Sequence, residues 1–517
     1  MIVIMTTLRC MLFALLGLGA LPAQADPLAG LEDWIEVERK RWGVPGLALA
    51  IVHQDQVLLA RGFGQLGLHD DSAVNADTQF GIASLSKAMT ATALGFLVED
   101  GKLDWDDRVI DHVPEFRLSD DWVSAQVTLR DLLSHRVGVG RLLGNRLTFM
   151  PDRSRAQFMR HLRYHEFEQA FRQGYVYSNA MYTVAGEVLE RASGQSWESF
   201  LDERLFAPLG MDRSNTSIDD LDDNAALPHQ EIDGDLVPIA RRDWGYSGPA
   251  AGVNSTINDL ARWMRFNLGR PGELDGKILM DRAVVQAIQQ PANLIGFNAE
   301  EHTINAYALG WGIGRYRGYH LLRHGGATDG FHSQVWLLPE LDLGIVISAN
   351  TFTELRDSLF KHIVDRVAGL KQKDWADKAY ADYLDRRREA REARAAVHAE
   401  RQVDTQPSRE LQAYVGHYHD PLYDTAEVLL ADGVLKLRLW GDASQTLYLE
   451  HWHHDTFRGR WANPAQREKF VWFRLGDDGQ PDALKVSFTL RPHVLQEGIY
   501  PAAAARVVEF RRVAADN

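Results

Sequence analysis

The amino-acid sequence predicts an α+β protein with more than one domain, and three observations support this prediction. The chain has 517 residues, of which 45% are hydrophobic and 25% are charged, a composition typical of globular proteins with a large core. Strand-like apolar runs lie near both ends of residues 26–370, with helix-like segments and long loops between them. Residues 409–517 alternate apolar and polar side chains over short runs, which is typical of an all-β domain.

Within residues 26–370, each predicted element follows from its local pattern. The elements are a hairpin, a buried helix and three late strands, at 46–52 with 56–60, at 86–99, and at 308–313, 334–338 and 343–347. The helix is rich in Ala, Met, Leu and Phe, and Asp100 and Gly101 provide its stop. Because strands from distant segments must meet, we expect one mixed sheet with a helical insertion.

The first 25 residues predict an export signal peptide. Arg9 precedes an apolar run at 11–21, and the small-residue motif at 23–25 suits a cleavage site. The alternative is an anchor helix, but the run is well short of the ~20 residues that a bilayer span needs. Cys10, the only cysteine, lies in this leader. We therefore expect a periplasmic or secreted protein with no disulfide and no membrane span in the mature chain.

The charge distribution excludes one class of partner and marks a boundary. The net charge of −15 repels phosphate backbones, so we expect no nucleic-acid partner. Residues 371–408 are charged and rich in Ala, with little apolar face, and predict a solvated helical linker. The predicted organisation is thus a signal peptide (1–25), a main domain (26–370), this linker and a C-terminal β domain (409–517).

A Ser-Xaa-Xaa-Lys tetrad places a hydroxyl and an amine on one face of a helix, where the amine can accept the hydroxyl proton. The chain has two such tetrads, Ser84 to Lys87 and Ser358 to Lys361. Ser84 follows a strand-like run at 78–83 and precedes the apolar helix, whereas Ser358 lies inside a continuous helical pattern. Ser84 is therefore the candidate nucleophile; the alternative is a serine that only caps the helix.

Two further motifs contain candidate site residues. Tyr177-Ser178-Asn179 follows a glycine-containing loop; Tyr177 could act as a base beside a lysine, and Asn179 could orient that lysine or a substrate amide. The glycine-rich run at 324–330 contains His324 and Gly326 and would let a substrate backbone approach closely. The alternatives are an ordinary turn and a hairpin loop with an exposed histidine.

In this order and context, the three motifs resemble the serine β-lactamase and penicillin-binding-protein-like hydrolases, especially the branch of class C β-lactamases and D-aminopeptidases, peptidase family S12. The resemblance covers about residues 35–365 and implies an antiparallel sheet flanked by helices, with a helical subdomain. It implies Ser84 as nucleophile, Lys87 and Tyr177 as the proton-handling pair, and the N–H groups of Ser84 and Ala327 as the oxyanion hole. Asn179, His324 and Gly326 would bind substrate, with no metal and no cofactor.

The C-terminal β domain resembles, more loosely, the lipocalin-like barrels attached to some peptidases of this branch. No Lys-Thr-Gly or Lys-Ser-Gly occurs in the chain, and His324 stands where the β-lactamases of the family place lysine. A neutral histidine holds a carboxylate less firmly than an ammonium does, which favours the D-aminopeptidase members. We therefore expect a secreted serine hydrolase of short amides or peptides that contain D-amino acids.

Other functions stay open at this point. The same site could hydrolyse small esters or β-lactams, or the chain could bind peptidoglycan-like peptides without catalysis, and it could form a homo-oligomer. The nucleophile elbow Gly-Xaa-Ser-Xaa-Gly is absent, and His165-Glu166 lacks the second histidine of a zinc helix. A histidine cluster in the β domain, at 451–455, has no spacing that specifies a metal.

Overall fold

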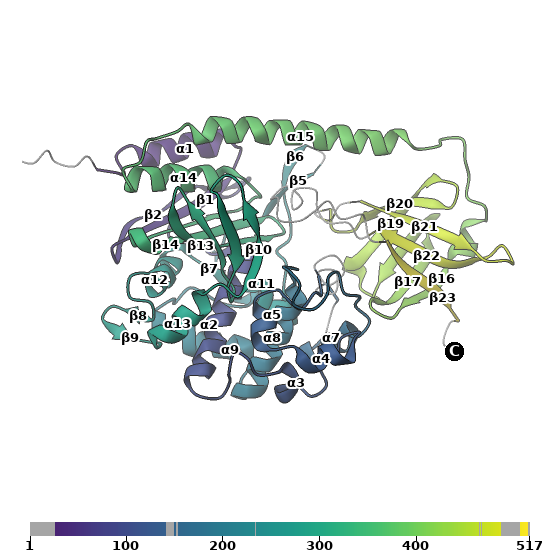
Figure 1. Ribbon diagram of the computed structural model, residues 1–517. Coiled ribbons are helices and arrows are strands. Elements are labelled where there is room, and N and C mark those ends of the chain that lie inside the picture. Colours follow the sequence, from purple (N-terminus) through teal and green to yellow (C-terminus); the bar gives the residue numbers. More distant parts are fainter. Residues whose placement is uncertain are drawn as a thin grey trace, which may run out of the picture.

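The computed structural model describes residues 26–140, 149–150, 153–232, 234–464, 466, 468–487 and 507–514. The predicted signal peptide, residues 1–25, lies outside this part of the chain. Figure 1 shows a sheet with helices on its faces, a group of helices below it, a long helix along its top and a barrel to one side. No helix in the described ranges is long and apolar enough to cross a bilayer.

The main sheet has nine strands in the order β10-β11-β12-β13-β14-β15-β1-β2-β3. Every neighbouring pair runs antiparallel, as the family resemblance implies, so the expectation of a mixed sheet was wrong. The strands are β1 (Gly46–His53), β2 (Gln56–Gly67), β3 (Asp70–Ala73), β10 (Asn293–Asn298), β11 (Thr303–Tyr307), β12 (Gly312–Tyr316), β13 (Tyr319–Thr328), β14 (Phe331–Leu338) and β15 (Leu343–Ala349). The first and last segments of the domain meet where β1 pairs with β15.

Strand β1 shows how one segment supplies two cores. Side chains alternate across a strand, and Leu47, Leu49 and Ile51 face one way while Ala48 and Ala50 face the other. The leucine and isoleucine side chains pack with α1 (Leu31–Arg41) and α14 (Leu355–Val367). The small alanine side chains on the opposite face let α12 (Ile257–Asn267) pack close to the sheet, and they join the core that also contains α2 (Ser86–Glu99). The sheet is therefore buried on both faces.

The segment between β3 and β10 builds most of the helical subdomain below the sheet (Figure 1). Its other helices are α3 (Val109–His112), α4 (Asp121–Gln126), α5 (Leu129–Leu133), α7 (Arg155–Leu162), α8 (Asn179–Ser193), α9 (Trp197–Leu201), α10 (Ala207–Leu209), α11 (Gly248–Ala251) and α13 (Arg282–Gln289). Its short turns are η1 (Ala83–Leu85), η2 (Asp202–Phe206), η3 (Ile218–Asp220) and η4 (Gly245–Ser247). Outside this segment, the turn η5 (Pro339–Leu341) connects β14 to β15. Its strand pairs are β4 (Phe80–Gly81) with β7 (Asn254–Ser255), β5 (His229–Ile232) with β6 (Asp235–Pro238), and β8 (Glu273–Leu274) with β9 (Lys277–Ile278).

Several local predictions are confirmed and one is wrong in part. The hairpin β1–β2, the helix at 86–99 and the strands at 334–338 and 343–347 are present. No strand covers 308–311, because Gly310 has a φ of +84° and lies against Lys87 and Ala88 of α2. The alternative of a hairpin loop for the glycine-rich run is excluded, since β13 continues through it to Thr328.

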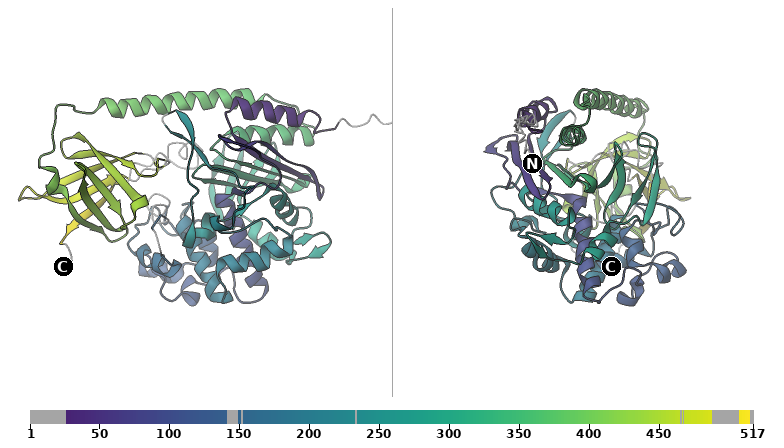
Figure 2. Two further views of the ribbon diagram at one scale, coloured as in Figure 1. Left: turned by 180° about the vertical axis from the view of Figure 1, so that it is seen from behind. Right: turned by 60° about the vertical axis from the view of Figure 1, so that its left-hand side comes forward.

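Helix α15 (Trp375–Ala399) connects the sheet domain to a closed eight-stranded barrel (Figure 2). The first part of α15 packs through Tyr380 and Tyr383 on the core beside α14, a contact that the charge pattern did not predict. The barrel strands are β16 (Gly416–Asp420), β17 (Asp424–Ala431), β18 (Val434–Leu439), β19 (Thr446–His453), β20 (Thr456–Trp461), β21 (Lys469–Leu475), β22 (Pro481–Ser487) and β23 (Val507–Val513), with turns η6 (Leu411–Tyr414) and η7 (Ala443–Gln445).

The barrel confirms the predicted all-β C-terminal fold. In β18 the three leucines are buried while Lys436 and Arg438 are only partly covered, as alternation requires. The barrel also contacts the helical subdomain, where Arg153 forms a 2.7 Å ion pair with Asp424.

Candidate active site

Ser84 occupies a tight turn between β4 and α2. It is the central residue of η1, and the preceding Ala83 has a φ of +49°, an uncommon conformation for a residue with a side chain. Neither η1 nor α2 has a side-chain cap, so Ser84 does not cap the helix. Its hydroxyl group instead accepts hydrogen bonds from Lys87 and Tyr177.

Lys87 lies on the same helical face as Ser84, and its side chain is fully buried. Its Nζ lies 3.1 Å from Ser84 Oγ, 2.7 Å from Asn179 Oδ1 and 2.7 Å from the carbonyl oxygen of Ala250. These three acceptors are uncharged oxygens and match the three N–H donors of an ammonium. The Tyr177 ring lies 4.8 Å from Nζ, near enough for a cation–π contact. Asn179, the first residue of α8, thus orients the lysine.

Tyr177 is 7% exposed, and its hydroxyl donates a 2.9 Å hydrogen bond to Ser84 Oγ. Lys87 and Tyr177 therefore both donate hydrogen bonds to Ser84 Oγ. The serine proton can be accepted only after Lys87 or Tyr177 has lost its own proton, which is the task of a general base. The structure brings together the four residues predicted from two separate motifs, Ser84, Lys87, Tyr177 and Asn179.

His135 contacts Tyr177, although it belongs to none of the three motifs described in the sequence. Its ring lies 4.3 Å from the Tyr177 ring, and its Nδ1 accepts a 3.1 Å hydrogen bond from the N–H of Ser178. The carbonyl oxygen of His135 also accepts a hydrogen bond from Val176 N–H. His135 is fully buried with a φ of +59°. In the sequence, the only indication of this role is a single histidine two residues before Val137-Gly138.

His324 is buried and does not present a charge to the site. Its Nε2 lies 2.7 Å from the hydroxyl of Tyr307, and its Nδ1 lies 2.8 Å from the carbonyl oxygen of Gly325. Because a carbonyl only accepts, Nδ1 carries the proton and Nε2 accepts from Tyr307. Burial, together with the charge of Lys87, lowers the pKa of His324 to about 3. The imidazole is therefore neutral and has both nitrogens engaged.

Gly326 and Ala327 lie where β13 passes the turn that contains Ser84. A Cβ on Gly326 would come within 2.0 Å of the carbonyl oxygen of Ile82, so only glycine permits this approach. Ala327 follows with an exposed side chain, and β13 contacts η1 directly. The backbone of Ala327 therefore passes close to the turn that contains Ser84. The oxyanion role of the two N–H groups stays a prediction.

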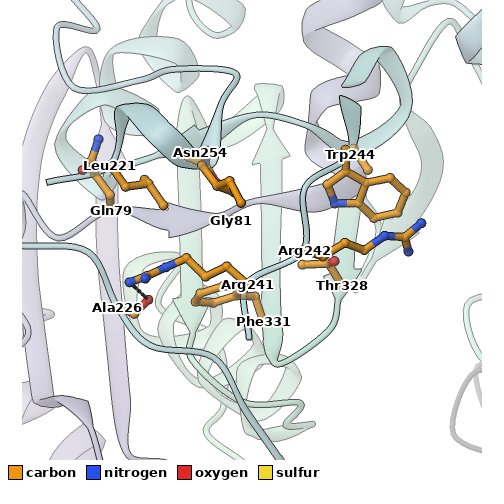
Figure 3. A pocket seen from close by; sticks show the side chains of 12 residues that line it. Gln79, Gly81, Leu221, Ala226, Arg241, Arg242, Trp244, Asn254, Thr328 and Phe331 are labelled. Atoms are coloured by element: carbon orange, nitrogen blue, oxygen red, sulfur yellow. Dashed lines mark hydrogen bonds between the residues drawn. The ribbon is translucent and has the colours of Figure 1, made fainter. Parts of the chain in front are cut away.

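A small, partly open pocket with an accessible volume of about 20 Å³ is lined by residues from several of the same segments (Figure 3). The residues that line the pocket come from several separate segments of the chain: Gln79, Gly81, Ile218, Leu221, Ala226, Arg241, Arg242, Trp244, Ala251, Asn254, Thr328 and Phe331. Three of them are close neighbours along the chain of residues described above. Gly81 lies three positions before Ser84, Thr328 follows Ala327, and Ala251 follows the carbonyl that binds Lys87.

The candidate histidine cluster of the barrel has other contacts. His454 Nε2 lies 2.9 Å from Gln402 Oε1, and Asp455 accepts a hydrogen bond from Ser408. Across the part of the chain that the structure describes, no three His, Cys, Asp or Glu residues lie close enough to hold a metal ion.

Two models of known protein families match this chain. A family model described as Beta-lactamase matches residues 31–370, which is more than half of the chain. The chain belongs to the Beta-lactamase family. Within this family of serine hydrolases the resemblance drawn from the three motifs is confirmed, as is the predicted fold. A second model, described as a domain of unknown function (DUF3471), matches residues 400–497.

Two curated relatives and two proteins of known structure are similar to this chain. "Unguisins hydrolase ungD'" of Aspergillus campestris is 28% identical over 89% of this chain and 90% of its own length. "Protein flp" of Staphylococcus aureus is 24% identical over 67% of this chain and 68% of its own. The octameric penicillin-binding protein homologue from Pyrococcus abyssi superposes with a TM-score of 0.60 at 21% identity, over 89% of this chain and 98% of that chain.

The second solved structure, SurE, also shares the fold of this Beta-lactamase family member. It superposes with a TM-score of 0.58 at 18% identity, over 94% of this chain and 99% of that chain. A further structure of the same protein, solved with D-Leu, has a TM-score of 0.55 at 17% identity over the same shares of the two chains. The similarity to SurE extends over the barrel as well as the sheet domain, since each of its two structures covers 94% of this chain.

Proposed function

We propose that this chain is a D-aminopeptidase-like serine hydrolase that cleaves short amides or peptides containing D-amino acids through an acyl-enzyme on Ser84. The observation that carries the proposal is the double contact on Ser84 Oγ, 3.1 Å from Lys87 Nζ and 2.9 Å from the Tyr177 hydroxyl. A serine hydroxyl needs a neighbouring base at neutral pH, and the two groups supply one.

The proposed reaction has two balanced steps. Ser84 Oγ attacks the carbonyl carbon, its proton passes to the Lys87–Tyr177 pair, and the N–H groups of Ser84 and Ala327 stabilise the oxyanion. As the C–N bond breaks, the pair returns the proton to the leaving amine and an ester with Ser84 remains. Water then attacks this ester with the same pair as base, which releases the carboxylic acid and restores Ser84.

The preference for D-amino acids and the S12 branch are supported by two observations. His324 is neutral where the β-lactamases of the family place lysine, and SurE, which shares the fold, has been solved with D-Leu. One relative, aligned over 90% of its own length, is named as a hydrolase of unguisins. We also propose that the mature chain is periplasmic or secreted, as its leader predicts. Its assembly into a homo-oligomer is supported by the octameric homologue.

The experiment compares hydrolysis of D- and L-aminoacyl p-nitroanilides, p-nitrophenyl butyrate and nitrocefin by the wild type and Ser84→Ala. The proposal predicts that D-amides are preferred and that the variant loses this activity. Turnover of the ester alone would favour the esterase, and turnover of nitrocefin would favour a β-lactamase. Unchanged hydrolysis of every substrate by Ser84→Ala would contradict the acyl-enzyme, and failure to cleave any would favour a peptide-binding protein.

A further inference from the structure

Tyr177 belongs to a segment that has no regular secondary structure of its own. Residues 174–178, the Tyr177 loop, form neither helix nor strand and directly precede α8. The Tyr177 hydroxyl nevertheless lies 2.9 Å from Ser84 Oγ, a distance at which a proton can pass between the two oxygens. The position of this hydroxyl must therefore depend on contacts of the loop with other segments.

The end of α5 provides the first of these contacts. The carbonyl groups at and just beyond the last residue of a helix have no partner within the helix. Here the carbonyl oxygen of Leu133 accepts a 2.7 Å hydrogen bond from the Tyr182 hydroxyl, and that of His135 accepts one of 2.9 Å from the N–H of Val176. Because Val176 directly precedes Tyr177, the end of α5 holds the backbone of the Tyr177 loop.

Asn293, the first residue of β10, binds to both segments. Its Nδ2 lies 3.0 Å from the carbonyl oxygen of Ser134, 3.3 Å from that of His135 and 3.2 Å from that of Gly174. All three neighbours are acceptors, so the amide nitrogen faces them and one of its two N–H groups is shared between two oxygens. The first two oxygens follow α5 and the third lies three residues before Tyr177. One side chain therefore ties the end of α5 to the Tyr177 loop.

The main sheet in turn holds Asn293. In the register of β10 and β11 it lies opposite Tyr307, and the preceding Ala292 donates a 2.9 Å backbone hydrogen bond to the Tyr307 carbonyl oxygen. The carbonyl oxygen of Ala292 accepts a 3.3 Å hydrogen bond from Arg136, whose guanidinium is paired with the buried Asp131. A side chain that starts from a strand is placed more precisely than one that starts from a loop.

We propose that Asn293 is a positioning residue that holds the Tyr177 hydroxyl at hydrogen-bond distance from Ser84 Oγ. The inference rests on the proposed function and deepens it, since it says how one member of the proton-handling pair is kept in place. Asn293 acts through the backbone of the Tyr177 loop, to which its amide is bonded. A misplacement of about 1 Å at a proton-handling group can lower a rate about 100-fold, so such a contact can control catalysis.

The test compares Asn293→Asp with the wild type in stopped-flow acylation by a chromogenic ester. Aspartate has the same shape, but when ionised it donates no hydrogen bond and places a negative charge against three carbonyl oxygens. We expect the acylation rate at saturation to fall roughly 10- to 100-fold, while the dissociation constant of the ester changes less than about twofold. A weaker binding of the ester with an unchanged acylation rate would contradict the positioning role.

The matched control is Asn298→Asp on the same strand. The side-chain oxygen of Asn298 accepts hydrogen bonds from the N–H groups of Glu300 and Glu301, at 3.0 and 3.3 Å, and a carboxylate can accept both. This variant adds the same charge to β10 and should keep the wild-type acylation rate. Equal losses in the two variants would overturn the proposal. Asn293→Ala removes the donor without adding a charge and should show the same loss if the aspartate variant does not fold.

A double-mutant cycle tests whether Asn293 acts through Tyr177. Tyr177→Phe removes the hydroxyl that Asn293 positions. In this background Asn293→Asp should change the acylation rate less than about threefold, because the group to be positioned is gone. A loss as large as that in the wild-type background would indicate a general structural effect and overturn the proposal.

Crystal structures of the wild type and of Asn293→Asp separate this inference from the proposed function, since they need no turnover. We expect the Tyr177 hydroxyl of the variant to lie beyond hydrogen-bond distance of Ser84 Oγ, more than about 3.5 Å away. This displacement supports the role of Asn293 even if no ester or amide acylates Ser84, in which case only the hydrolase proposal fails. An unchanged distance would overturn the role of Asn293 even in an active enzyme.

Discussion

The hydroxyl of Tyr307 donates a 2.7 Å hydrogen bond to Nε2 of His324, and this contact fixes the charge of the position where related enzymes have lysine. Burial raises the pKa of Tyr307 well above its ordinary value, so the phenol keeps its proton and remains a donor. The histidine in turn remains neutral. The position of His324 on β13 therefore carries no positive charge.

Tyr307→Phe should destabilise the protein, because Nε2 of His324 would be left buried without its donor. An unsatisfied buried polar group costs about 1–3 kcal/mol. Urea unfolding at pH 7 measures the change in free energy. Tyr164→Phe is the matched control, since Tyr164 is 51% exposed and its loss should change stability by less than about 0.5 kcal/mol. Equal values for the two variants would contradict the buried hydrogen bond.

Stability should fall as the pH decreases from about 6.5 toward 3, and His324 should account for part of the loss. The pKa of His324 is lower in the folded than in the unfolded chain, so between these values the unfolded chain binds the extra proton. His324→Gln removes this group. Unfolding measured at pH 7, 5 and 4 should therefore show a shallower decrease in the variant than in the wild type. Parallel curves would show that His324 titrates normally.

Tyr177→Phe and Lys87→Ala should each lower the rate of acylation by roughly 100-fold or more, because each removes one of the two groups that handle the serine proton. Stopped-flow acylation with a chromogenic ester measures this step. Lys361→Ala alters the second Ser-Xaa-Xaa-Lys tetrad, in which the Ser358 hydroxyl contacts the carbonyl oxygen of Trp375 instead. Its acylation rate should equal that of the wild type.

His135→Leu should lower kcat by roughly 10- to 100-fold with little change in KM, since it disturbs the position of Tyr177 and not the binding of substrate. Asn in its place can accept the Ser178 N–H and tolerates a positive φ, so His135→Asn should recover much of kcat. Steady-state kinetics of both variants tests the positioning role. Equal losses in the two variants would indicate a purely structural effect.

Much of this architecture was predictable from local patterns. The helix at 86–99 is rich in apolar residues and ends at Asp100 and Gly101, and the barrel strand β18 alternates strictly. The strand predicted at 308–313 was wrong because the left-handed conformation of Gly310 is imposed by contact with α2, which no local pattern shows.

The site was predictable only where neighbours in sequence are neighbours in space. Ser84 and Lys87 lie on one helical turn, so their spacing predicts their contact. Tyr177 and Ser84 are 93 positions apart in the chain, and the contact of His324 with Tyr307 joins two different strands. Their burial, and therefore their charge state, depends on tertiary packing.

The most direct measurement is the mass of the protein after reaction with an activated acyl ester, followed by mapping of the modified peptide. Acyl transfer from the ester should add one acyl group to Ser84 in the wild type, and Ser84→Ala should remain unmodified. The added mass should then disappear as water hydrolyses the ester bond. An unmodified wild type, or an acyl group on Ser358 in place of Ser84, would contradict the assignment of Ser84 as the nucleophile.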